Sequence, residues 1–153
     1  MGRDSRPDNL FSTAARGGVR GAIASMAMSG MRQATTSLGL LDEVPPDAIL
    51  RRTAPRIVSR VPVRRRRALV EFVHWSYGSA GGVLFGALPR GLRRRPWVGP
   101  LYGFAFWALY EAVLAPALGL EEHRKDVRQQ AAVLADHLLY GAVVASSPWP
   151  HAD

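Results

Sequence analysis

The sequence predicts an all-α protein, a four-transmembrane-helix bundle built from two tandem two-helix repeats. One observation is that four apolar runs alternate with polar, arginine-rich links along the 153 residues. A helix of about 22 residues extends for about 33 Å, enough to cross a hydrocarbon layer of about 30 Å. The other observation is a motif that occurs twice, His-x-x-Tyr-Gly, at His74–Gly78 and again at His137–Gly141.

The runs that precede the two motifs also resemble each other. Each opens with two glycines four positions apart and closes with Leu-Gly-Leu. The opening glycines are Gly17 with Gly21 and Gly99 with Gly103, and the closing segments are residues 38–40 and 118–120. A tandem duplication of one helix pair explains both similarities.

Composition narrows the class of protein. The formal net charge is +8 and there is no cysteine, which excludes disulfides, thiolate metal sites and thiol nucleophiles. A basic chain suits nucleic acid, anionic lipid or a membrane protein with basic loops. Because the arginines cluster between the apolar runs, we expect the lipid bilayer as the partner and no nucleic acid.

Residues 1–16 are polar and are predicted to form a disordered tail, and residues 17–147 a single membrane domain. The first span covers about 17–41. It is the least apolar of the four, but small residues recur at every fourth position, which lets membrane helices approach closely. These residues are Gly17, Gly21, Ser25 and Ser29.

A basic amphipathic connection is predicted for residues 42–67. Pro45 and Pro46 end the first helix, and Asp47 can cap a short helix that lies on the membrane surface and ends near Pro55. A solvated loop is the alternative. The connection closes with four arginines suited to anionic lipid headgroups: Arg64, Arg65, Arg66 and Arg67.

The remaining spans are predicted at about 68–89, 97–118 and 130–147, with a tail at 148–153. The third is the most apolar, and Glu111 is its one charged residue. Pro116 near its end frees a backbone carbonyl. These features predict a multi-pass protein of the bacterial cytoplasmic membrane. Which side the termini face stays open, because the charge distribution and the even number of spans point in opposite directions.

Counting residues from the helix ends predicts a polar layer inside the bundle, roughly 10 Å below one membrane face. Its members are Arg32, Glu71, His74, Tyr77, Glu111, Asp136, His137 and Tyr140. A charge at mid-membrane costs about 2.5–3.5 kcal/mol on insertion scales, which favours pairing. We expect Arg32 to pair with Glu111.

Three interpretations of this layer stay open. It fixes helix register through hydrogen bonds, it carries protons, ions or small solutes, or it binds haem or a metal. Glu71-x-x-His74 resembles half of a di-iron helix motif, but the second half is missing because position 134 is leucine. There is no Gly-x-Ser-x-Gly elbow and no Walker loop. We therefore expect a non-enzymatic structural, accessory or stress-related component, with no catalytic residues, metal or cofactor.

Glycines are predicted to mediate helix packing throughout the bundle. The positions are Gly17, Gly21, Gly78, Gly82, Gly99, Gly103 and Gly141. With this many small-residue faces, some remain available to a second copy or another membrane protein. A homodimer or a role as a subunit of a membrane complex is therefore plausible.

The whole pattern resembles a family of small four-helix integral membrane proteins of actinobacteria, whose function is unknown. The resemblance covers about residues 17–145. It rests on the paired His-x-x-Tyr-Gly elements and on Trp107-x-x-Tyr110 before Pro116. It implies membrane location and topology, and no reaction. A small apolar residue is usual in that family at the position of Asp136, so the resemblance assigns no role to Asp136.

Overall fold

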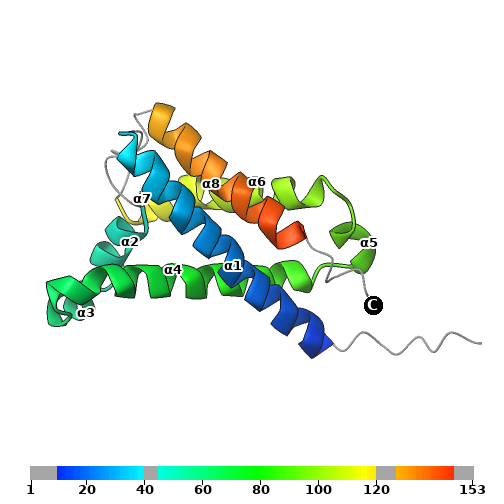
Figure 1. Cartoon of the computed structure of the whole chain (residues 1–153), viewed down its shortest axis with the longest axis horizontal. Helices are drawn as coiled ribbons and strands as arrows, with labels where there is room; N and C mark the ends of the chain where they lie inside the picture. Colours follow the sequence, from blue (N-terminus) through cyan, green and yellow to red (C-terminus); the bar gives the residue numbers. More distant parts are fainter. Residues whose placement is uncertain (1–9, 40–44, 120–126, 147–153) are drawn as a thin grey trace, which may run out of the picture.

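Figure 1 shows a computed structural model of the chain, which describes residues 10–39, 45–119 and 127–146. All regular elements in this part are helical, which confirms the all-α class. The elements are α1 (Leu10–Ser37), α2 (Pro45–Thr53), α3 (Pro55–Arg60), α4 (Val63–Gly86), α5 (Arg90–Arg93), α6 (Val98–Leu109), the π-helix η1 (Tyr110–Leu114), α7 (Ala115–Ala117) and α8 (Val127–Ala145).

The four predicted spans correspond to α1, α4, the continuous stretch α6–η1–α7, and α8, but α1, α4 and α8 begin earlier than expected. Residues 10–16, assigned from the sequence to a disordered tail, are the first turns of α1. They pack because Gly86 of α4 leaves room for the backbone carbonyl of Thr13. Residues 1–9 and the predicted tail at 148–153 lie outside the described residues.

The connection between the first two spans is helical rather than a loop. It contains α2 and α3, separated at Ala54, just before Pro55. The helix α4 then starts at Val63, directly after Pro62, so Arg64–Arg67 lie in its first turns and not in the connection. Arginine is a good helix former, and exposed guanidinium groups at a helix end keep their hydration.

The bundle consists of two closely packed helix pairs (Figure 1). α1 crosses α4, α6 packs along α8, and α1 also contacts α8, which joins the pairs. In the first pair, Gly17 and Gly21 lie against the backbone of Gly82 and Gly78. A side chain at Gly17, Gly21 or Gly82 would collide with main-chain atoms of the other helix, and one at Gly78 would collide with the side chain of Ser25. Glycine therefore sets the spacing of α1 and α4.

The second pair uses the same kind of contact. Gly99 lies against the carbonyl of Gly141, and Gly103 lies against the carbonyl of His137. α4 and α6, in contrast, meet through aromatic rings. Phe85 and Tyr102 are 5.1 Å apart between ring centroids. Large rings hold these two helices further apart than the glycine contacts hold each pair.

The first helix of each pair ends in the same way. Gly39 and Gly119 have positive φ angles, 70° and 64°, and their N–H groups donate to the carbonyls of Thr36 and Pro116. Glycine adopts this left-handed conformation without a steric penalty, which makes it the usual residue after a helix end. The two Leu-Gly-Leu segments therefore begin with the same helix stop.

The π-helix η1 precedes Pro116, which has no N–H to donate to the carbonyl four residues earlier. The N–H of Ala115 instead donates to the carbonyl of Tyr110, five residues back. Turns of this kind are rare and frequently occur near functional sites.

Four spans were predicted, and one helical stretch in the described residues, Val98–Ala117, is long and apolar enough to cross a membrane by length and composition. Its most apolar window has a mean hydropathy of 1.3. The other long helices have more polar sequences. α1 contains Arg20 and Arg32, α4 opens with four arginines, and α8 contains Asp136.

Candidate functional site

A cavity of about 320 Å³ lies among α1, α2, α4, α6, η1 and α8. Most of its wall is apolar, and α2 closes one side with Ile49, Leu50 and Thr53. A hydrogen bond holds α2 in place, because Arg52 Nε donates to the carbonyl of Leu118 at 2.9 Å, beyond the end of α7. Small-molecule sites in proteins typically have volumes of 300–1,000 Å³ and mostly apolar walls with a few polar groups.

Most of the predicted polar layer faces this cavity. The members in its wall are Arg32, His74, Tyr77, Asp136, His137 and Tyr140. Glu71 lies beside the wall and is connected to it through Ser29. Glu111 belongs to η1, whose residues Tyr110 and Leu114 line the cavity.

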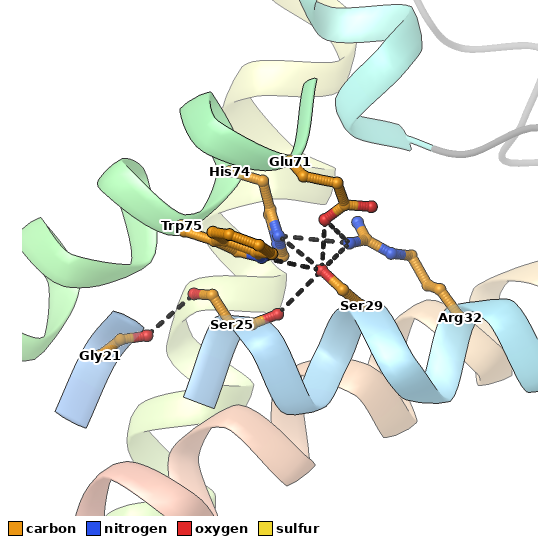
Figure 2. A network of polar contacts seen from close by, with 7 residues as sticks. All are labelled: Gly21, Ser25, Ser29, Arg32, Glu71, His74 and Trp75. Carbon is orange, nitrogen blue, oxygen red and sulfur yellow. Dashed lines mark hydrogen bonds and ion pairs between the residues drawn. The ribbon is translucent and has the colours of Figure 1, made fainter. Parts of the chain in front are cut away.

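The hydroxyl of Ser29 is the centre of a polar network between α1 and α4 (Figure 2). It donates to Glu71 Oε2 at 2.5 Å. It accepts from Arg32 Nη2 at 2.9 Å and from the indole N–H of Trp75 at 3.2 Å. The carbonyl of Ser25, 3.1 Å away, is a second acceptor within reach of the same hydroxyl proton, which can be donated to one acceptor at a time.

Arg32 has a different partner from the one predicted. Its ion pair is with Glu71, at 3.8 Å between Nη2 and Oε2, and not with Glu111 as the sequence suggested. The reason is the close approach of α1 and α4, which brings the Glu71 side of α4 to the Arg32 side of α1. Arg32 is 5% exposed, so the ion pair forms where water is largely absent.

The contacts of His74 determine which ring nitrogen carries the proton. Arg32 Nη2 lies 3.2 Å from His74 Nδ1. Because a guanidinium can only donate, Nδ1 is the acceptor and the proton of the neutral ring is on Nε2. His74 therefore contributes a hydrogen-bond donor.

His137 is the opposite tautomer, with the proton on the other ring nitrogen. Its Nδ1 lies 2.7 Å from the carbonyl of Val133. A carbonyl can only accept, so Nδ1 carries the proton, and Nε2 of the neutral ring is an acceptor. The ring of Tyr110 stacks on this imidazole, with 6.3 Å between ring centroids. The cavity thus has one histidine as donor and the other as acceptor.

Asp136 is the group in the wall whose hydrogen bonding is incomplete. It is 3% exposed, and its Oδ1 atom has no hydrogen-bond partner in the described part of the chain. The charge of Arg32 attracts it across the cavity without a direct bond. A buried carboxylate oxygen without a partner carries a desolvation cost of about 1–3 kcal/mol or more.

The two tyrosines of the repeated motif have different roles. The hydroxyl of Tyr140 donates to the carbonyl of Gly78 at 2.6 Å and ties α8 to α4. Tyr77 is 49% exposed, and its ring lies at a tilt of 59° to the ring of Phe106, 6.0 Å away between centroids. Tyr102, which the sequence did not single out, donates to the carbonyl of Gly81 at 2.7 Å.

Sequence reasoning missed Ser29 as a polar group. The signal was present, because Ser25 and Ser29 continue the four-residue spacing of Gly17 and Gly21. That spacing indicated packing alone. Ser25 does pack in this way, since its side chain fills the space beside Gly78, whereas Ser29 connects three polar side chains.

In the described residues, the polar side chains of the site form neither a grouped metal-ligand set nor a nucleophilic triad. Within residues 10–39, 45–119 and 127–146 no three His, Asp or Glu side chains are grouped to hold a metal ion. Ser29 Oγ lies 3.5 Å from His74 Nδ1, but that nitrogen already accepts from Arg32. Glu71 binds the serine rather than the histidine, so the three do not form a nucleophilic triad.

Comparison of the chain with family models, curated proteins and solved structures finds no match. The resemblance to small actinobacterial membrane proteins therefore stays a prediction, and function is argued from the site.

Proposed function

We propose that this chain is a multi-pass protein of the bacterial cytoplasmic membrane that binds a small, largely apolar molecule in the cavity between its helices and catalyses no reaction. It is in this sense an accessory component of the membrane. The observation that carries the proposal is the mostly apolar cavity with the unpartnered Oδ1 of Asp136 in its wall.

The exterior of the bundle supports membrane insertion. Only 22% of the most apolar part of Val98–Ala117 is buried, which is a small fraction for the core helix of a water-soluble bundle. Large apolar side chains are exposed on all four long helices, among them Ile23 on α1, Leu84 on α4, Phe104 on α6 and Leu138 on α8. Soluble monomers rarely expose apolar surface on this scale.

Four spans in two duplicated pairs are consistent with the packing. The same glycine-to-carbonyl contacts occur in both pairs, and the first helix of each pair ends at a glycine with positive φ. The pairing is offset, because Gly21 meets Gly78 whereas Gly103 meets His137, one turn earlier in the motif. Duplication followed by a shift of one helical turn accounts for both the likeness and the difference.

The polar groups of the cavity indicate which polar group a bound small molecule would carry at one end. Asp136 Oδ1 and His137 Nε2 both accept hydrogen bonds, and His74 Nε2–H donates one. A hydroxyl or amino group matches this set, because it donates to the acceptors and a hydroxyl also accepts from His74. The apolar wall then surrounds a hydrocarbon body.

The arginines at the start of α4 support the same location. The side chains of Arg64, Arg65 and Arg67 are exposed, and Arg66 donates from Nε to the carbonyl of Val61. A cluster of cations at the end of a spanning helix attracts anionic lipid headgroups, by about 1 kcal/mol for each residue.

Ligand binding is tested on protein reconstituted in lipid nanodiscs. Decanol, decylamine and decane share a hydrocarbon body and differ in the polar end, and thermal unfolding is followed with each. We expect decanol and decylamine to raise the unfolding temperature more than decane, and Asp136→Leu to remove that difference. Equal effects of all three in the unsubstituted protein would contradict the proposal.

A second candidate function is proton transfer through the layer. The favouring observation is that the two histidines of the cavity are protonated on opposite nitrogens, so donor and acceptor face a shared space. A His74→Gln, His137→Gln double variant distinguishes the two functions. It should abolish pH-dependent flux in vesicles if protons pass through the histidines, and match the unsubstituted protein if the site only binds.

A further inference from the structure

Arg20 is a second buried arginine of α1, located between Gly17 and Gly21. It is 8% exposed, and one of its nitrogens, Nη1, donates to the carbonyl of Val144 at 3.3 Å. A second guanidinium nitrogen, Nη2, is buried and has no hydrogen-bond partner within the described residues. Arg20 lies twelve positions before Arg32, or about 18 Å along the helix, so it is far from the cavity network.

Among the described residues, the charges that act most strongly on Arg20 are positive. Arg93 of α5 and Arg16 of α1 both repel it. Arg90, also in α5, has a buried Nε without a partner in the part of the chain that the structure describes. Arg93 is held at the end of α4 because its Nε donates to the carbonyl of Leu88 at 2.9 Å.

Acidic groups with described side chains are at the other end of the bundle. These are Glu71, which pairs with Arg32, Asp136 in the cavity wall, and Glu111 in η1. Figure 1 shows the separation, with α5 and the end of α8 at the right and α2 and α7 at the left. The described carboxylates thus lie away from Arg20, Arg90 and Arg93.

There is space for an anion at this end. A hollow of about 390 Å³ is lined by Arg93, Arg94 and Arg95 together with the last turn of α8, at Ala142, Ala145 and Ser146. Val144, the partner of Arg20, belongs to the same turn. Arg93 therefore borders both the hollow and Arg20.

We propose that the hollow lined by Arg93, Arg94 and Arg95 binds a phosphate group, with Arg20 beside the same turn of α8. This site is separate from the cavity of the proposed function. A buried guanidinium nitrogen without a partner is costly and neighbouring arginines repel one another, so an anion with several oxygens lowers both costs at once. Guanidinium groups bind phosphate oxygens through paired N–H bonds, which a single lysine ammonium cannot imitate. The phosphate can come from a phospholipid headgroup or from a free anion.

The test uses protein in a maltoside detergent, which contains no phosphate. Thermal unfolding is measured with inorganic phosphate, against chloride at equal ionic strength, and separately with dioctanoyl phosphatidylglycerol. We expect stabilisation that saturates with at least one of the two. Saturation by inorganic phosphate assigns a free anion, and saturation by the lipid alone assigns a headgroup.

Two substitutions locate the site. Arg93→Gln leaves Arg20 and its bond to Val144 intact, so it should fold, and it should weaken phosphate binding by about tenfold, a change of ~1.4 kcal/mol. Arg93→Lys keeps the charge and should still weaken binding, because the paired N–H geometry is lost. Arg56→Gln, on exposed α3, removes the same charge at the other end and should have no effect. No stabilisation in the parent protein, or equal losses in Arg93→Gln and Arg56→Gln, would overturn the site.

Discussion

At the scale of single residues, the cavity region combines a cluster of side chains that hydrogen-bond to one another with a single side chain, Asp136, that lacks a partner in the described chain. Ser29, Arg32, Glu71 and His74 donate to and accept from one another. Asp136, from α8, has a buried oxygen without a partner in the described chain. The first group specifies how α1 meets α4, and the second is available to something from outside.

The ion pair between Arg32 and Glu71 is tested by a double-mutant cycle. Arg32→Met leaves a carboxylate beside Ser29 without its cation, and Glu71→Leu leaves a buried guanidinium without its anion. Each should lower the free energy of unfolding by about 3 kcal/mol, the low end for breaking a buried pair, since Glu71 is partly exposed. The double variant should lose less than the sum.

The control for this cycle is the pair that the sequence suggested. Arg32→Met combined with Glu111→Leu should give additive losses in the same unfolding measurement. Coupling with Glu111 and additivity with Glu71 would reverse the assignment.

Asp136 is predicted to cost stability in the empty protein. Asp136→Leu removes a buried oxygen without a partner and should raise the free energy of unfolding by about 1–3 kcal/mol. Denaturant unfolding without added ligand measures this gain. A loss of stability instead would mean that the carboxylate has a partner of its own.

The residues of the polar layer could be predicted from the sequence, but not their pairing. Counting turns from the helix ends gives the depth of a side chain, and most members of the layer do lie around one cavity. Depth does not give the direction around the helix axis. That direction depends on which faces pack, and the glycine contact between α1 and α4 brings Glu71, rather than Glu111, to Arg32.

At the scale of helices, glycine contacts decide the architecture. Gly21→Ala should lower the free energy of unfolding by about 1–3 kcal/mol, the usual range for overpacking, because its Cβ would meet the carbonyl of Gly78. Gly30→Ala in the same helix is the matched control. Nothing lies within 4 Å of a Cβ at that position, so the change should stabilise α1 by about 0.5–1 kcal/mol. Equal effects at both positions would argue against the close approach.

The glycine positions were readable from the sequence because their four-residue spacing is regular. The positions of the helix ends were harder to predict from the sequence. Residues 10–16 are polar in sequence and still helical, because the contact of Thr13 with Gly86 is a tertiary one that local composition does not reveal.

At the scale of the whole molecule, the proposed four-span arrangement implies a definite topology. It places α3 and the end of α5 on opposite membrane faces, because α4 alone lies between them. The chain has no cysteine, so single cysteines can be introduced in place of exposed Arg56 and Arg94. A membrane-impermeant maleimide should label only one of these variants in spheroplasts, and both after lysis. Labelling of both before lysis would exclude four spans.

The π-turn at Tyr110–Leu114 also sets the rotational phase of everything that follows it in the helix. The turn takes up one residue more than an ordinary α-turn. If it closed to α geometry with that residue still present, the residues after it would turn by about 100° about the axis, one residue's share of a 3.6-residue turn. Leu114 and Leu118 would then leave the cavity wall, and the carbonyl that Arg52 binds would move away from α2. Deleting Ala112 removes the extra residue, so the turn can close to α geometry while the cavity keeps its wall on that side.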